Sequence, residues 1–212
     1  DIYTESELSE FEKSIMETGN EVELMARKLF PSGILIERRD EKGQKATQDY
    51  ITQKQEILFQ PILVKDNYLA AIDILKFEPE TGNYSVYEVK STNDVDEKAH
   101  YHDLAFQINL LRKCGLKINK AHLIHLNSEY VRSGELDIAQ LFKIVDVSNE
   151  VESVSESVTT EAAEALKYLS QDAEPKGFCC CIYKGRSRHC STFHPANPAV
   201  PEYSVHDIAR IG

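Results

Sequence analysis

Three apolar, β-rich segments lie close together in the first half of this 212-residue chain, and they constrain its fold more than any other feature. They cover residues 57–64, 69–77 and 84–89. Asp66-Asn67 separates the first two segments, and Glu80-Thr81-Gly82-Asn83, a hairpin turn sequence, separates the last two. The pattern therefore predicts antiparallel strands that follow one another directly along the chain.

Helical patterns surround these strands. Apolar residues recur at helical spacing from Thr4 to Phe30, and a long helix is expected from Asp96 to Cys114, where Gly115 ends it. The order of helix, antiparallel strands, helix and strand indicates an α/β fold with a central mixed sheet flanked by helices. The other expected elements are a strand at 33–37, a helix at 46–55, strands at 121–126 and 141–147, and a helix at 151–169.

A domain boundary is expected at Glu174-Pro175-Lys176-Gly177, after which the chain becomes rich in cysteine and proline. We interpret residues 1–173 as a core domain and residues 174–212 as a Cys-rich extension packed on it. The first residue is Asp1 instead of Met, as in a fragment or a trimmed chain. No apolar run is long enough to span a bilayer and no signal-peptide pattern is present, so we expect a cytoplasmic protein without membrane contact.

The formal net charge of -11 at pH 7 argues against a protein that coats duplex DNA through bulk electrostatics. The charge is compatible with a nuclease, because catalytic carboxylates are acidic and a bound divalent cation reverses the local charge. Any contact with nucleic acid then requires a local basic patch.

Two carboxylates and a lysine interrupt the apolar segments. Asp73 is flanked by isoleucines, and Glu88 and Lys90 are two residues apart in the next segment, so these two share one face of a strand. Hairpin pairing can bring Asp73 beside them. Converging carboxylates repel each other unless a cation lies between them, and Mg²⁺ or Mn²⁺ prefers such oxygen ligands. The alternative is a half-exposed hairpin whose charges lie on its solvated side.

The helix that follows carries a polar stripe. Asp103 and Gln107 are four residues apart and therefore lie on one helical face. Gln107 lies among apolar residues, which is not typical of the wet side of an amphipathic helix. Beside the strand of Glu88 and Lys90, such a stripe could orient a water molecule or a phosphate. The combination favours a functional site over a solvated hairpin.

These motifs resemble the successive motifs of the PD-(D/E)xK nuclease superfamily, specifically its RecB-like branch. The resemblance is carried by Asp73, by Glu88-Val89-Lys90 and by Asp103-Leu104-Ala105-Phe106-Gln107. The chain resembles in particular a poorly characterised prokaryotic family that joins this nuclease core to a C-terminal cysteine cluster. The resemblance covers most of the chain and extends to residues 19–33, 127–131 and 181–190.

The resemblance implies a restriction-endonuclease-like core and a role for each matched residue. Asp73 and Glu88 would bind the metal, together with the backbone carbonyl of Val89. Lys90 would act as catalytic base or as stabiliser, and Gln107 would lie near the substrate. These roles are expectations that follow from the family.

Two positions depart from the family pattern. Many RecB-like nucleases carry a histidine four residues after a helix glycine, and counting from Gly19, this chain has Glu23. Either Glu23 replaces the histidine as a metal ligand, or the site uses fewer protein ligands and more water. Many also carry a tyrosine four residues after the glutamine, where this chain has Leu111.

A cysteine cluster marks the C-terminal extension. Four of the five cysteines crowd together there, which indicates metal or cluster ligands in a reducing compartment instead of a disulfide framework. Thiolates select zinc, iron–sulfur clusters or Cu(I). The resemblance implies a [4Fe–4S] cluster held by Cys179, Cys181 and Cys190, with a fourth cysteine from before the core. No cysteine precedes Cys114, so in a complete chain Cys180 or His189 would complete the site, or zinc would replace the cluster.

Basic residues surround the cysteines. Lys184, Arg186 and Arg188 are candidates for contacts with a nucleic-acid phosphate backbone, and a solvated loop is the alternative.

The sequence thus predicts a Mg²⁺- or Mn²⁺-dependent (exo)deoxyribonuclease that acts on single-stranded DNA or duplex ends, and it does not distinguish endonuclease from exonuclease action. Metal held by Asp73 and Glu88 would activate water for attack on the phosphodiester, assisted by Lys90. One alternative is a catalytically inactive nuclease fold that binds nucleic acid or serves in assembly. Another is a nuclease restrained by a protein partner, which the sequence does not identify.

Overall fold

The computed structural model describes residues 10–94, 97–171, 193–201 and 203–205. The described residues between Ser14 and Leu169 form one compact unit, and the residues before and after them belong to a second unit. In the second unit a single helical turn, α6 (Phe193–Ala196), is followed by Asn197, whose Nδ2 donates to the carbonyl of Phe193 at 2.8 Å. The cysteine cluster, the basic residues beside it and the expected domain boundary lie outside the described residues.

The core unit contains every helix and strand expected from the sequence, although two expected strands are each divided in two. Its helices are α1 (Glu10–Ala26, which begins in the second unit), α2 (Glu41–Thr52), α3 (Glu97–Lys113), α4 (Ile138–Leu141) and α5 (Ser148–Leu169), with a 3₁₀ turn η1 (Arg27–Leu29) after α1. Its strands are β1 (Ile34–Leu35), β2 (Ile57–Phe59), β3 (Ile62–Lys65), β4 (Tyr68–Ala71), β5 (Ile74–Glu78), β6 (Asn83–Lys90), β7 (Ile118–Leu126) and β8 (Phe142–Asp146).

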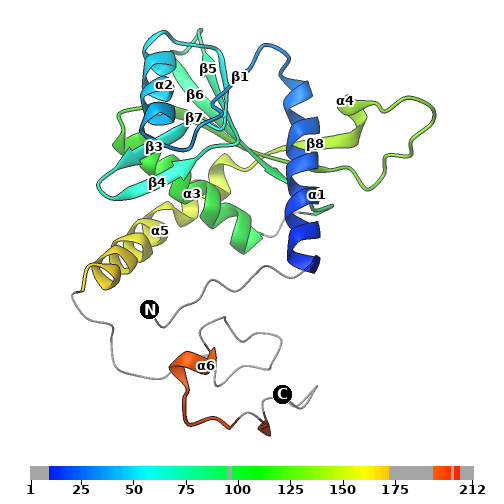
Figure 1. The fold of residues 1–212 in the computed structure, drawn as a ribbon. Coiled ribbons are helices and arrows are strands. Elements are labelled where there is room, and N and C mark those ends of the chain that lie inside the picture. The colour runs from blue at the N-terminus through cyan, green and yellow to red at the C-terminus, as the bar shows by residue number, and fades with distance from the viewer. Residues whose placement is uncertain (1–9, 95–96, 172–192, 202, 206–212) are drawn as a thin grey trace. The chain divides into compact units, whose positions relative to one another are not determined.

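Six strands form a mixed sheet in the order β1-β2-β5-β6-β7-β8 (Figure 1). Strands β1 and β2 are parallel, as are β6 and β7, whereas β5 and β8 are antiparallel to their neighbours. Helix α3 connects β6 to β7 as the crossover that a parallel pair requires. The expected α/β fold with a central mixed sheet is therefore confirmed. The carboxyl ends of β2 and β6 lie at the same edge of the sheet, where β5 begins.

Both faces of the sheet are buried, because alternate residues of each strand point to opposite sides. On one face the sheet packs against α3 and α5, and on the other it packs against α1. Helix α5 packs along α3, and Asn109 and Ser155 bind each other across this contact at 2.7 Å. The first face is built from Leu58, Leu75, Val86 and Leu123 with Leu104, Leu111, Val151 and Val158, and the second from Ile57, Phe59, Ile74, Tyr87 and Ile124 with Val22 and Ala26.

A bend divides the two expected strands 57–64 and 69–77. Gln60 has a positive φ of 53°, and Pro61 has no N–H to contribute to a strand ladder. Across the bend, Gln60 N–H donates to the Asp73 carbonyl at 3.1 Å, and Ile72 N–H donates to the Pro61 carbonyl at 3.0 Å. Asp73 therefore lies between β4 and β5, and the expectation that it sits within a strand was wrong.

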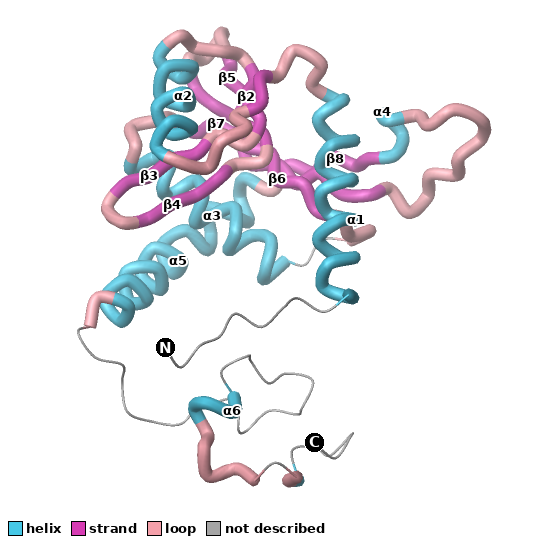
Figure 2. The backbone as a smooth tube through the Cα atoms, in the orientation of Figure 1, coloured by secondary structure: helices cyan, strands magenta, loops and turns pink. Residues whose placement is uncertain are grey.

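Beyond the bend, β3 and β4 leave the main sheet as a separate two-stranded ribbon (Figure 2). Lys65 pairs with Tyr68, so the ribbon turns through two residues, Asp66 and Asn67. Both have positive φ, 51° and 64°, as a type I′ turn requires. The break expected between the first two apolar segments at Asp66-Asn67 is therefore a two-residue hairpin turn.

Helix α2 begins earlier than its apolar pattern predicts. Asp40 caps it, because its carboxylate accepts from the backbone N–H groups of Lys42 and Gly43 at 3.0 and 3.1 Å. The hydrogen bond from Arg38 and these backbone bonds lower the pKa of Asp40 to about 2. The Asp40 cap thus lets α2 begin at Glu41, five residues before its apolar stripe.

Two helical glycines are expected to respond in opposite ways to replacement by alanine. A Cβ at Gly43 would lie 1.8 Å from the backbone carbonyl oxygen of Arg38, whereas a Cβ at Gly19 in α1 meets nothing within 4 Å. We expect Gly43→Ala to lower the free energy of unfolding by about 1–3 kcal/mol, and Gly19→Ala to raise it by up to about 1 kcal/mol. Urea unfolding of both variants checks this, and equal effects would contradict the close packing of α2 on the Arg38 backbone.

Within the described residues, no helix is both long and apolar enough to cross a membrane.

Candidate active site

The carboxylates and the lysine singled out in the sequence meet at the edge of the sheet. Ile74 pairs with Tyr87, so Asp73 lies next to the strand position of Glu88. Lys90 Nζ lies 3.0 Å from Glu88 Oε1, which places both side chains on the α3 face of β6. Asp73 Oδ2 accepts from the backbone N–H of Val89 at 2.8 Å. The expected juxtaposition of these residues is therefore present.

Helix α3 turns its polar stripe toward the same strand. Gln107 Nε2 donates to Glu88 Oε2 at 2.8 Å, and Asp103 Oδ2 lies 2.9 Å from Lys90 Nζ. Gln107 and Glu88 are both buried. The Oε1 atom of Gln107 is also buried and has no hydrogen-bond partner among the described residues. The stripe is thus part of the cluster, with Gln107 buried against Glu88 and Asp103 exposed beside Lys90.

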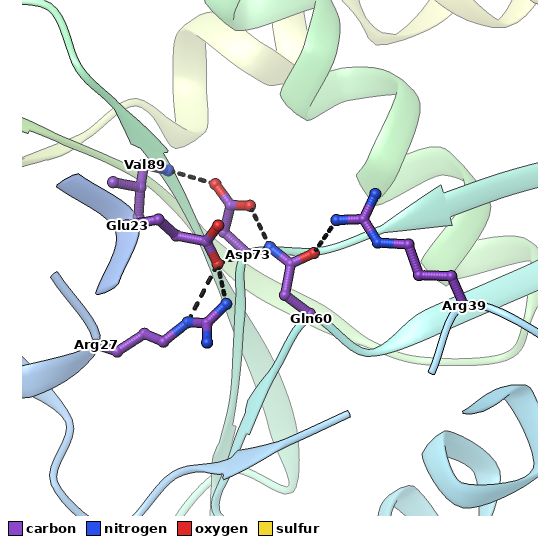
Figure 3. A network of polar contacts seen from close by, with 6 residues as sticks. All are labelled: Glu23, Arg27, Arg39, Gln60, Asp73 and Val89. Atoms are coloured by element: carbon purple, nitrogen blue, oxygen red, sulfur yellow. Dashed lines mark hydrogen bonds and ion pairs between the residues drawn. The ribbon is translucent and has the colours of Figure 1, made fainter. Parts of the chain in front are cut away.

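Helix α1 contributes an acid to the other side of the cluster (Figure 3). Arg27 Nη2 and Nε donate to Glu23 Oε1 at 2.6 and 3.2 Å, and the Arg27 guanidinium also lies over the ring of Phe59. The same Glu23 oxygen accepts from Gln60 Nε2 at 2.7 Å. Glu23 therefore lies in the cluster, where its charge is balanced by Arg27.

Gln60 links the two groups of carboxylates. Its Nε2 donates to Asp73 Oδ1 at 2.9 Å as well as to Glu23, and its Oε1 accepts from Arg39 Nη2 at 3.1 Å. In Figure 3 the contacts form a chain from Val89 through Asp73 and Gln60 to Arg39. Because the amide bridges two acids that would otherwise repel each other, it fixes the position of the Asp73 side chain from the β2 side.

Burial and charge set the protonation of the cluster. Burial, followed by the charge of Glu88, raises the pKa of Asp73 to about 8, although the hydrogen bond from Val89 N–H opposes the shift. Burial alone would lower the pKa of Lys90, but the charges of Glu88 and Asp103 and the hydrogen bonds to them outweigh it and raise this pKa. At neutral pH the lysine is therefore a cation, and Asp73 carries a proton unless another positive charge compensates it.

The residues fit a hard divalent cation. Asp73 and Glu88 supply carboxylate oxygens, the raised pKa of Asp73 marks a place where a cation would replace a proton, and Gln107 Oε1 is a buried acceptor without a partner among the described residues. No group of three or more His, Cys, Asp or Glu side chains is arranged to hold a metal within the part of the chain that is described. Mg²⁺ does not need such a group, because it is commonly held by one or two carboxylates and water.

Gln60 and Arg39 were not foreseen as site residues. Gln60 is a polar residue inside an apolar segment and is followed by proline, which is the same kind of interruption that drew attention to Asp73. No sequence feature distinguishes Arg39 as a site residue, because it lies in a turn in which the neighbouring residues are also charged.

Leu111 stands where the resemblance to RecB-like nucleases leads one to expect a tyrosine, and its surroundings in the fold are apolar. Leu111 is fully buried in the core between α3, α5 and the sheet. It lies one turn further along α3 than Gln107, in a place that packs against other apolar side chains. A polar group at this position would not reach a substrate without leaving the core.

A scan against models of known protein families finds no match to this chain, and a search of the curated proteins finds no relative.

Proposed function

We propose that this chain is a metal-dependent nuclease of the PD-(D/E)xK type, with a restriction-endonuclease-like core, that hydrolyses phosphodiester bonds in DNA. The observation that carries the proposal is the convergence of Asp73, Glu88, Lys90 and Gln107 at one edge of the sheet. Contacts of 2.8–3.0 Å connect Glu88 to Gln107 and to Lys90, and Asp73 to the backbone of Val89. The proposed ligands are Asp73, Glu88 and the Val89 carbonyl.

The charges of the site support phosphodiester chemistry. A bound Mg²⁺ or Mn²⁺ supplies positive charge to the scissile phosphate and lowers the pKa of the attacking water. Lys90 stays protonated between Glu88 and Asp103, so its ammonium group can stabilise the negative charge that develops on the phosphate. We therefore assign Lys90 the role of electrostatic stabiliser and not that of general base.

The remaining contacts hold the acids in place. Gln107 restrains Glu88 from the helix side, and Gln60 and the Val89 N–H restrain the two oxygens of Asp73. Such restraint matters because a reacting group displaced by about 1 Å can lose roughly 100-fold in rate. The charge of Glu23 is balanced by Arg27. We propose that Glu23 either shapes the site or contributes a carboxylate oxygen at the periphery of the metal site.

The direct test is cleavage of labelled single-stranded and duplex DNA by the purified chain with Mn²⁺, Mg²⁺ or EDTA. We expect cleavage with Mn²⁺, none with EDTA, and a loss of roughly 10²–10³-fold in Glu88→Gln. A Glu88→Gln variant that cleaves as fast as the parent would show that the activity comes from elsewhere.

One observation favours a second candidate, a nuclease fold that binds nucleic acid without cleaving it. Glu88 already has a cation in contact, because the Lys90 ammonium lies 3.0 Å from its Oε1. In that case the parent would bind labelled DNA in EDTA but would not cleave it with either metal.

A further inference from the structure

Three arginines lie directly after α1 or in the turn before α2, and two of them are paired with carboxylates. Arg27 gives both of its contacts to Glu23 and is mostly buried over Phe59. Arg38 is paired with Asp40, the cap of α2. Arg39 differs from both, because among the described residues its guanidinium has one hydrogen bond, to a neutral amide oxygen, and no carboxylate partner.

The amide that holds Arg39 also holds Asp73, a proposed metal ligand. Gln60 is mostly buried, and both ends of its amide are in use, with Oε1 toward Arg39 and Nε2 toward Asp73 and Glu23. A single side-chain amide thus separates the guanidinium from the Asp73 carboxylate, as Figure 3 shows. The Arg39 side chain is exposed, so its other N–H groups remain available to a ligand.

We propose that Arg39 binds a phosphate group of the nucleic-acid strand next to the one at Asp73, and that Gln60 positions it. This inference rests on the proposed function. A guanidinium presents two parallel N–H groups that match the oxygens of a phosphate, and it stays charged at any physiological pH. The formal net charge of the chain is -11, so its overall electrostatic field repels a nucleic-acid strand. An arginine without a carboxylate partner beside the acidic cluster provides a local positive charge that can bind a phosphate there.

Gln60 also couples the orientation of Arg39 to that of Asp73, because it is hydrogen-bonded to both side chains. Because one amide bonds to both groups, the direction of the Arg39 guanidinium and the direction of the Asp73 carboxylate are set by the same side chain. Arg39 is thus a substrate-binding residue, and Gln60 is a positioning residue that acts through Arg39 and Asp73.

The binding test avoids cleavage altogether. The affinity of the full chain for a fluorescein-labelled single-stranded oligonucleotide is measured by anisotropy in EDTA at several salt concentrations. We expect Arg39→Ala to weaken binding about tenfold and to reduce the slope of log affinity against log salt by about one, as for the loss of one phosphate contact. Arg39→Lys should fall between the parent and Arg39→Ala.

The matched control is Arg38→Ala, which removes an adjacent exposed arginine that is paired with Asp40. We expect it to change the affinity less than twofold. The affinity of Arg39→Ala is also compared for oligonucleotides with a 5′-phosphate and with a 5′-hydroxyl. A loss of affinity only for the 5′-phosphate oligonucleotide assigns Arg39 to the terminal phosphate. An equal loss of affinity for both assigns Arg39 to an internal phosphate. Unchanged affinity and salt slope in Arg39→Ala, or an equal loss in Arg38→Ala, overturns the proposal.

Kinetics separate the positioning role from a structural one. With Mn²⁺, Arg39→Ala should raise KM about tenfold and leave kcat within about threefold, whereas Gln60→Ala should raise KM and lower kcat as well. If the two residues act as a unit, the variant with both Arg39→Ala and Gln60→Ala should have the same KM as Gln60→Ala alone. If the increases in KM of the two single variants multiply in the double variant, Gln60 does not act through Arg39 and the positioning role is wrong. If the parent binds DNA through Arg39 but does not cleave it, the proposed nuclease activity is wrong and the inference about Arg39 still holds.

Discussion

Replacing Asp73 by asparagine is expected to lower the activity strongly and to stabilise the metal-free protein at the same time. The activity should fall by roughly 10²–10³-fold, because the proposed site loses one of its two carboxylate ligands. The free energy of unfolding at pH 8 in EDTA should rise by roughly 1–3 kcal/mol, because relief of the buried charge outweighs the loss of one of the two hydrogen bonds that the Asp73 oxygens accept. Few substitutions outside a functional site have this pair of effects.

The sign of the stability change follows from the pKa of Asp73. Burial and the charge of Glu88 raise this pKa from its ordinary 3.8 to about 8, so between these two values the folded chain holds a proton that the unfolded chain has lost. The stability of the metal-free parent therefore declines as the pH rises from about 4 to about 8. Asp73→Asn lacks this decline, so its advantage should be largest near pH 8 and small near pH 5.

Urea unfolding at pH 5 and pH 8 in EDTA measures this difference, and Asp66→Asn is the matched control. Asp66 is exposed at the turn of the β3–β4 ribbon, where its positive φ suits asparagine equally well. Mn²⁺ at about 100 times its dissociation constant should raise the melting temperature of the parent by roughly 5–10 °C and that of Asp73→Asn far less. A pH-independent difference between parent and variant would contradict the buried charge.

Lys90 is expected to act through its charge, which two substitutions can test. Lys90→Ala should lower cleavage by roughly 10²–10³-fold, because the ammonium group that faces Glu88 and Asp103 is removed. Lys90→Arg keeps a positive charge but cannot lose a proton in the accessible pH range. We therefore expect Lys90→Arg to retain at least about tenfold more activity than Lys90→Ala.

The control is Lys143→Ala, which removes an exposed lysine of β8 that is paired with Glu129. It should leave cleavage unchanged. If Lys90→Arg is as inactive as Lys90→Ala while both remain folded, Lys90 must give up a proton during the reaction, and its assignment as a stabiliser is wrong.

Much of this site follows from simple periodicity. Glu88 and Lys90 share a face because they are two residues apart in a strand, and Gln107 reaches them because α3 directly follows that strand. Asp73 was expected beside Glu88 because a continuous strand was predicted through it. In the structure it lies beside Glu88 because β5 begins directly after it. Alternation predicts which side of a strand faces the core, but it does not predict where a strand bends.

The contacts from α1 and from the turn before α2 were beyond reach of the sequence. Gln60 joins residues that are 37 and 13 positions away in the chain, and Arg39 reaches it across 21. Such pairings depend on how the elements pack, and no local pattern encodes them. Glu23 was singled out by resemblance, but its ion pair with Arg27 is a property of the folded helix.

The bend at Gln60-Pro61 also disfavours one misalignment of the strands. In a hairpin, a slip of one residue turns every side chain of a strand to the opposite face, and here it would point Asp73 away from Glu88. A slipped ribbon would bring Pro61 opposite the Asp73 carbonyl, where Gln60 now donates, and proline has no hydrogen to give. The proline thus penalises this misalignment, in which the aspartate would face away from Glu88.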